Sequence, residues 1–265
     1  MSTIPAVMPP LPRDQSLGRG YAPATALQWL NAGWRDLLVQ PATSLIHGFI
    51  VFLVSAVIVV GLFAFGWDYI LFPAFAGFMV VGPILAVGLY EKSRRIAAGE
   101  SVSLAQMTIV RIASGGQILF TGVLLCLLML LWMRAAVIIY ALFFGLRPFP
   151  GLEHIAPMLF TTPIGGAMVI VGGAVGALFA AFSFAISVFS IPMMLEERVD
   201  ALTAMGTSMA LVWNNRPVML TWGAIVLALF LLSLATGLLG LIVAFPVLGH
   251  GTWHVYRAIR RQESR

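Results

Sequence analysis

Two histidines near the C-terminal end are the residues best suited to bind a metal. His250 and His254 are four positions apart, so on a helix both imidazoles lie on one face and could bind a metal ion or a haem iron. The other histidines are His47 and His154, and two imidazoles without a third ligand are a weak metal signal. We favour a second interpretation, in which the pair belongs with Trp253 to an interfacial belt at the end of an apolar segment. We expect no bound cofactor.

Acidic and imidazole side chains follow three prolines that occupy corresponding places along the chain. The sets are Pro83 with Glu91, Pro192 with Glu196 and Glu197, and Pro246 with the two histidines. If the three segments are repeats, their carboxylates and imidazoles approach one another and could bind a cation or a proton. We favour the alternative that the glutamates are solvated charges paired with neighbouring basic residues, because exposed ion pairs add little stability.

Arg134 lies deep inside a long apolar run that begins near Gln117. An arginine at the centre of a membrane helix costs at least ~2.5–3.5 kcal/mol. If the span ends near Arg134, its guanidinium reaches the outer headgroups and residues 135–146 form a second, surface-lying segment. If the span continues to Phe144, Arg134 is partly buried and pairs with Asp68. Either alternative makes Arg134 a structural residue rather than a substrate site.

The composition indicates which elements carry these residues. Of the 265 residues, 60% are hydrophobic and 9% are charged, whereas about a quarter are charged in soluble domains. Continuous apolar runs of ~20 residues favour membrane helices over the alternating strands of a barrel. The six predicted spans are Ala42–Phe65, Ile70–Tyr90, Gln117–Phe144, Ile164–Ile191, Val218–Ala235 and Leu238–Trp253.

The basic residues predict the orientation of these spans. Only Arg134 and Arg147 of the 15 Lys and Arg residues fall on the opposite side from the rest, and the positive-inside rule then places both termini in the cytoplasm. Prolines interrupt the first residues and no signal peptide is evident. We predict a flexible tail over 1–24, one transmembrane domain over 25–261 and a short C-terminal tail over 262–265.

A weak repeat predicts three cytoplasmic interfacial helices, one before each odd-numbered span. Each is an amphipathic stretch that ends at a breaker before the chain enters the membrane. Their apolar positions are Leu27, Leu30, Trp34 and Leu37; then Leu104, Met107 and Ile112; then Leu202, Met205, Met209 and Val212. The predicted fold is therefore all-α, with six transmembrane helices in three hairpins, each hairpin preceded by an amphipathic helix.

Small residues in the fourth span form a face of the GxxxG kind, which lets helix backbones approach closely. Gly172, Gly173 and Gly176 are its core. Such a face serves packing within the bundle or a dimer, and we favour packing within the bundle.

Three segments resemble landmarks of one family of bacterial integral membrane proteins, catalogued as domain of unknown function 2189. They are residues 33–38 with Pro41, the run 131–135, and the ending from Pro246 to Arg257. The resemblance covers residues 25 to 261. Some family members carry the label of a cytochrome c oxidase subunit. The resemblance implies an inner-membrane location and carries over no catalytic or binding residue.

No motif for nucleotide binding, hydrolysis or a zinc enzyme occurs in the sequence. We therefore expect no enzyme and no nucleic-acid partner, but a non-enzymatic accessory, assembly or scaffold component whose partners are membrane lipids and other membrane proteins. The alternatives are a small transporter or channel, with the three prolines as helix irregularities along its path, and a metal- or haem-binding accessory subunit of a respiratory oxidase.

Overall fold

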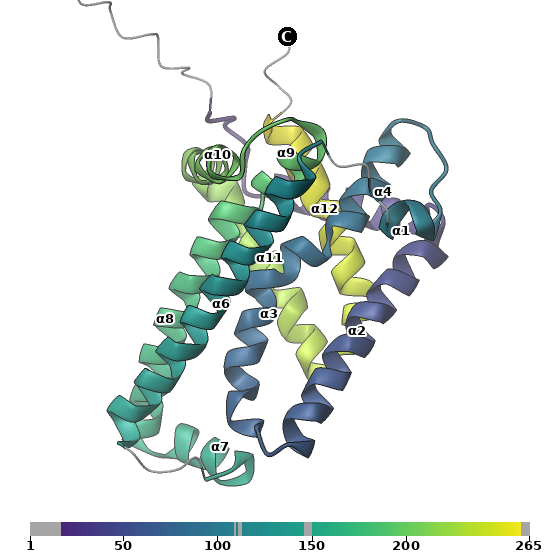
Figure 1. Ribbon diagram of the computed structural model, residues 1–265. Coiled ribbons are helices and arrows are strands. Elements are labelled where there is room, and N and C mark those ends of the chain that lie inside the picture. The colour runs from purple at the N-terminus through teal and green to yellow at the C-terminus, as the bar shows by residue number, and fades with distance from the viewer. Residues whose placement is uncertain (1–16, 109, 111–112, 146–149, 261–265) are drawn as a thin grey trace, which may run out of the picture.

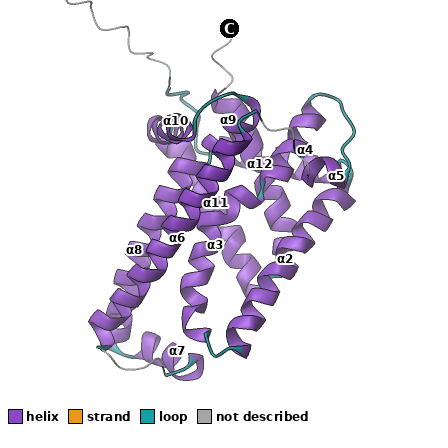
Figure 2. Ribbon diagram, viewed as in Figure 1, coloured by secondary structure: helices purple, strands orange, loops and turns teal. Residues whose placement is uncertain are grey.

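The computed structural model is built from α-helices, and the residues that it describes contain no strand (Figure 1, Figure 2). It describes residues 17–108, 110, 113–145 and 150–260. This confirms the all-α prediction. The predicted tails over residues 1–16 and 262–265, and Ile112 of the second amphipathic stretch, lie outside the described residues.

Within the described ranges, five helical segments are long and apolar enough to cross a membrane. They coincide with the first five predicted spans, because runs of ~20 apolar residues satisfy their backbone hydrogen bonds as helices. They are α2 (Pro41–Ala64); η1 (Asp68–Ile70), α3 (Leu71–Leu85) and α4 (Val87–Ala97) together; α6 (Gly115–Phe144); α8 (Pro163–Ser187) and α9 (Ser190–Glu196) together; and α11 (Arg216–Ala235).

The predicted sixth span forms a helix, α12 (Leu241–Arg260), that is not among these five segments. It carries both histidines of the pair and, in its second half, two arginines, and these residues lower its apolar character. It is also extensively buried, since it packs on α1 (Thr25–Leu38), α2, α4 and α11. The six-span layout is therefore not confirmed.

Two glycines allow α12 to lie directly against its neighbours. A Cβ at Gly33 of α1 would lie 2.5 Å from the carbonyl oxygen of Val247, and a Cβ at Gly48 of α2 would overlap the carbonyl oxygen of Ile242. Both contacts are between backbones, so a side-chain rotation cannot relieve them. Close backbone approach of this kind is how small residues hold membrane helices together by dispersion.

The remaining helices lie at the two ends of the bundle. α1, α5 (Leu104–Thr108) and α10 (Ala201–Asn214) occur where the interfacial helices were predicted, and they lie at the end that also carries α4 and α9 (Figure 1, Figure 2). α7 (Leu152–Thr161) lies at the opposite end. We call the first the basic end, because Lys92, Arg94, Arg95, Arg257 and Arg260 belong to its helices.

Part of the predicted flexible tail is docked on the basic end. The backbone N–H of Arg19 donates to Asn215 Oδ1 (2.8 Å), and its Nε donates to the carbonyl oxygen of Ile259 (2.8 Å). The Tyr21 hydroxyl donates to the carbonyl oxygen of Ala258. These bonds satisfy carbonyls of the last turn of α12, which have no partner within the helix. The first and last described segments therefore meet at the same end of the bundle.

Candidate functional site

A cluster of ionisable and hydroxyl side chains is buried where α1, α2, α4 and α12 meet near the basic end. We call it the polar cluster. Its members are Asp36 of α1, Ser44 of α2, Lys92 and Ser93 of α4, and His250 and His254 of α12. All but His254 are buried. Ser44 lies in the first turn of α2, Lys92 and Ser93 lie in the middle of α4, and the two histidines lie one turn apart on α12.

His250 is the centre of the polar cluster. Its side chain is fully buried; Nε2 lies 2.8 Å from the Ser44 hydroxyl and Nδ1 lies 2.8 Å from the Ser93 hydroxyl. Both ring nitrogens are thus engaged by helices other than its own. A buried polar group without partners would be costly in this interior, so these bonds fix the rotation of α12 against α2 and α4.

The hydrogen-bond donors can be assigned by following the protons. Lys92 Nζ donates to the Ser44 hydroxyl oxygen (2.7 Å), which leaves the Ser44 proton to be donated to His250 Nε2. Nδ1 then carries the imidazole proton and donates to Ser93, whose own proton points to the Asp36 carboxylate. One continuous chain of hydrogen bonds therefore joins Lys92 to Asp36 through a neutral imidazole.

Asp36 is the acidic end of this chain. Its carboxylate lies 2.9 Å from His254 Nε2. Burial alone would raise the pKa of Asp36, but hydrogen bonds from His254 and Ser93 and nearby positive charge outweigh burial and hold that pKa below its usual value. Asp36 is therefore the carboxylate of the polar cluster, and His254, which is partly exposed, connects it to the surface.

Lys92 is the basic end. Its side chain is fully buried, and besides Ser44 its ammonium donates to the Gln40 carbonyl oxygen (3.0 Å). No carboxylate within the described part of the chain forms a direct ion pair with it. Burying a charge is costly unless it is paired or hydrogen-bonded, and here the compensation comes from the two oxygens and the more distant Asp36. This is the most unusual electrostatic feature of the interior.

The predicted glutamates do not join the histidines. Glu91, fully buried, is held by Arg94 (2.7 Å) and Arg95 (2.6 Å) on its own helix. Glu196 and Glu197 face the end of α12. The structure therefore keeps the three glutamates apart from the histidine pair and does not form the shared cation site considered as one alternative.

Glu196 and Glu197 instead form a second group with α12. The Tyr256 hydroxyl lies 3.0 Å from Glu196 and 3.2 Å from Glu197, and Arg257 and Arg260 pair with the two carboxylates at 3.5 and 3.2 Å. Burial and the neighbouring carboxylates raise the pKa of Tyr256. Tyr256 is therefore a neutral donor, and the group ties α9 to the end of α12.

The histidine pair does not form a metal site with other ligands of the described chain. No group of three or more His, Cys, Asp or Glu side chains suited to a metal occurs within the residues that the structure describes. His250 would have to lose one serine partner to bind a metal, and His254 is engaged with Asp36. The two imidazoles have different partners although they lie on one helix.

Arg134 combines features of both predicted alternatives. α6 continues unbroken to Phe144, yet Arg134 is exposed on its surface, and no ion pair within the described chain joins it to the half-buried Asp68. Arg134 lies 19 residues after Gly115, the first residue of α6, or ~29 Å along the helix. Since hydrocarbon is ~30 Å thick, α6 is long enough to bring an exposed Arg134 to the far headgroups, with its last turns beyond them.

The other predicted structural residues lie on helix contacts or helix irregularities. Gly176 faces the Trp132 ring of α6, 3.0 Å from a Cβ placed there, while Gly172 lies 3.9 Å from Ile139 by the same measure. Trp34 is 45% exposed on α1.

α3 and α4 meet shortly after Pro83, and α8 ends before Pro192, whereas Pro246 lies inside an unbroken α12. A proline removes one helical hydrogen bond, which fits the two breaks.

The comparisons with known proteins concern the middle of the chain. Residues 71–196 match a family model described as a predicted integral membrane protein. The model is that of the DUF2189 family. The resemblance noted in the sequence is thereby confirmed for this segment, which runs from α3 to α9. No curated protein and no solved structure matches the chain. Of the polar cluster, Lys92 and Ser93 lie inside the matched segment, and the other four residues lie outside it.

Proposed function

We propose that this membrane protein is a non-enzymatic accessory, assembly or scaffold component. One observation carries the proposal: the ionisable groups near the basic end, which are buried or partly exposed, are engaged with one another across helices. Asp36 with His254, and Glu197 with Arg260, each join α12 to another helix. Groups used in this way hold α1, α4, α9 and α12 together. The surfaces left for partners are the apolar faces of the spans and the helices of the basic end.

The proposed topology places the basic end in the cytoplasm of a bacterial inner membrane, with α12 as the sixth crossing. Support comes from Lys92, Arg94, Arg95, Arg257 and Arg260, which belong to helices of one end, as the positive-inside rule requires. Arg134 is the described exception. Both described chain ends lie at the basic end, so a sixth crossing would leave both termini cytoplasmic.

The proposed partners are membrane lipids and other membrane proteins. Two residues of the predicted apolar face of α1 are available for them, because Leu27 is 58% exposed and Trp34 is 45% exposed, whereas Leu37 of that face is buried. Exposed aromatic and aliphatic side chains on a helix lying across the basic end suit the headgroup region. The opposite face of α1, with Ala26 and Trp29, is buried against the bundle.

The test is purification in mild detergent from cells that express the tagged chain at native level, followed by mass spectrometry. The scaffold proposal predicts specific membrane partners whose abundance falls when the chain is deleted. Leu27→Ser with Trp34→Ser should lose those partners, whereas Leu142→Ser, on the exposed surface at the far end of α6, should keep them. Purification of the chain alone from native membranes, with no partner lowered on deletion, would contradict the proposal.

A transporter is the second candidate, and the polar cluster is the observation that favours it. Ionisable residues inside membrane proteins commonly belong to ion or proton pathways, and the chain from Lys92 through His250 to Asp36 is continuous. The test is proton or solute flux in reconstituted vesicles, which Lys92→Met and Asp36→Asn should abolish and Arg134→Gln should spare. Equal background flux in all four proteins would exclude this candidate.

A further inference from the structure

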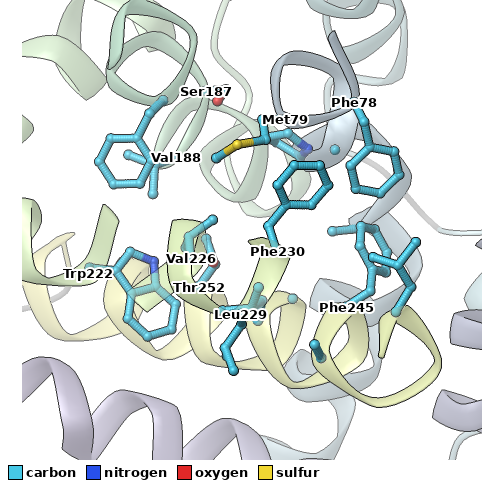
Figure 3. A pocket seen from close by; sticks show the side chains of 18 of the residues that line it. Phe78, Met79, Ser187, Val188, Trp222, Val226, Leu229, Phe230, Phe245 and Thr252 are labelled. Atoms are coloured by element: carbon cyan, nitrogen blue, oxygen red, sulfur yellow. The ribbon is translucent and has the colours of Figure 1, made fainter. Parts of the chain in front are cut away.

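An elongated cavity lies between α3, α8, α11 and α12 (Figure 3). Its volume is about 120 Å³, below the ~300–1,000 Å³ that is usual for drug-sized ligands, so it suits a slender occupant. Most of its lining is apolar, with Phe78, Phe230 and Phe245 packed on one another at ring-centroid distances of 5.5 and 6.0 Å. The cavity is therefore suited to a hydrocarbon.

The polar groups of the lining are not evenly distributed. Trp222, Tyr90, Ser187 and Thr252 line the part nearer the basic end. The rest is lined by Leu241, by phenylalanines and by Ser233, whose hydroxyl donates to the Leu229 carbonyl oxygen of its own helix. Trp222 is fully buried, and its indole Nε1–H has no hydrogen-bond partner among the described residues. Figure 3 shows the indole nitrogen turned toward the cavity. An indole N–H only donates, so the matching occupant carries an acceptor oxygen.

Length and depth define the occupant further. The lining residues of α12 run from Leu241 to Thr252, which is ~17 Å along a helix. An extended chain advances ~1.2 Å per bond, so the cavity accommodates on the order of a dozen carbons. Trp222 lies six residues after Arg216, the first residue of α11 at the basic end, or ~9 Å deeper. Carbonyl groups of lipids lie just below the headgroups, at a comparable depth.

From these observations we propose that the cavity binds one acyl chain of a membrane lipid, with its carbonyl oxygen accepting the Trp222 Nε1–H bond and its hydrocarbon extending past Phe245. Lipid and cavity are equally apolar, so moving the chain between them yields no hydrophobic gain. Selectivity for the acyl chain therefore has two sources. The carbonyl oxygen gives the buried Trp222 donor the hydrogen bond that it otherwise lacks, and the hydrocarbon fills the cavity.

The experiment uses the full chain in nanodiscs and two photoreactive probes, a fatty acid and the matching alkane, each with a diazirine in mid-chain. The fatty acid should label residues of the lining, such as Met79, in a saturable way. Trp222→Phe keeps an aromatic ring, although a smaller one, and removes the donor. It should weaken saturable fatty-acid labelling about three- to tenfold, the cost of one hydrogen bond. Alkane labelling should not change.

A pair of adjacent alanines on α8 provides a matched test of the space itself. Ala180 lines the cavity, while Ala181 is exposed. Ala180→Leu should reduce lining labels, and Ala181→Leu should not. Competition shows the source of the acyl chain: the bound probe is displaced either by free fatty acid alone or by phospholipid as well. Both results support the proposal. Labelling that does not saturate would overturn the proposal, as would labelling that Trp222→Phe and Ala180→Leu leave unchanged. In either case only water would accept the Trp222 Nε1–H bond.

Discussion

Gly48→Ala is the substitution that most sharply tests the position of α12. A Cβ at Gly48 would overlap the carbonyl oxygen of Ile242 and lie 2.9 Å from its carbonyl carbon and from Cγ of Pro246. Ordinary contact begins at 3.4 Å, so relief of the second contact alone requires a shift of 0.5 Å (3.4 − 2.9 Å). The atoms belong to backbone and to a proline ring, so α12 as a whole must move.

Overpacking of this kind costs about 1–3 kcal/mol, and the better helix propensity of alanine offsets at most ~1 kcal/mol. At ~2–4 °C per kcal/mol for a chain of this size, the melting temperature of Gly48→Ala in detergent should fall by several degrees. Gly61→Ala, on the same helix with nothing within 4 Å of the added Cβ, is the matched control and should melt at or above the wild-type temperature. Equal melting of both variants and wild type would refute the packing of α12 on α2.

Three further predictions concern hydrogen bonds. Ser44→Ala removes an oxygen that two buried partners use and should destabilise the protein by about 1–3 kcal/mol, whereas a melting temperature within one degree of wild type would contradict this. The pKa of Asp36 is lowered in the folded state. Its contribution to the free energy of unfolding is therefore present above the ordinary pKa of 3.8 and is lost as pH falls through the folded-state pKa. Wild type should lose stability more steeply than Asp36→Asn in melts below pH ~4. Trp132→Phe loses the 3.0 Å hydrogen bond to the Pro73 carbonyl oxygen and should lower the free energy of unfolding by ~0.6 kcal/mol, as for other membrane hydrogen bonds. A decrease above ~2 kcal/mol would contradict this prediction.

Much of the helical layout followed from the apolar runs, because a lipid-exposed backbone has few alternatives to the helix. The pairing of Glu91 also followed from spacing. Arg94 and Arg95 are three and four positions away, on the same face, whereas Lys92 is one position away and points elsewhere.

The polar cluster could not be predicted from local pattern. His250 meets Ser44 and Ser93 across 206 and 157 residues of chain, and single serines beside apolar runs carry no spacing signal. Asp36 was part of the α1 stretch, but its partner His254 is 218 residues away. Only the close approach of four helices determines which of these polar groups meet.

Arg134 shows why a boundary is harder to predict than a helix. The sequence prediction assumed that the helix ends where the membrane span ends. Under that assumption, Arg134 inside the apolar run either breaks the helix or is buried in the membrane. α6 has 30 residues, or ~45 Å, and can therefore leave the hydrocarbon at Arg134 and continue as a helix. The backbone requires no break where the lipid ends.

The central claim is that α12 is an internal helix packed against α4 and α2. Cross-linking between cysteines at Leu89 and Gly249 tests it most directly, since a Cβ at Gly249 would lie 3.0 Å from the Leu89 Cβ, close to the ~3.5–4.5 Å of disulfides. In a Cys126→Ser background, Leu89→Cys with Gly249→Cys should form a disulfide in membranes under mild oxidation. Leu89→Cys with Gly61→Cys should form none. Cross-linking of the first pair no greater than that of the second would contradict the account.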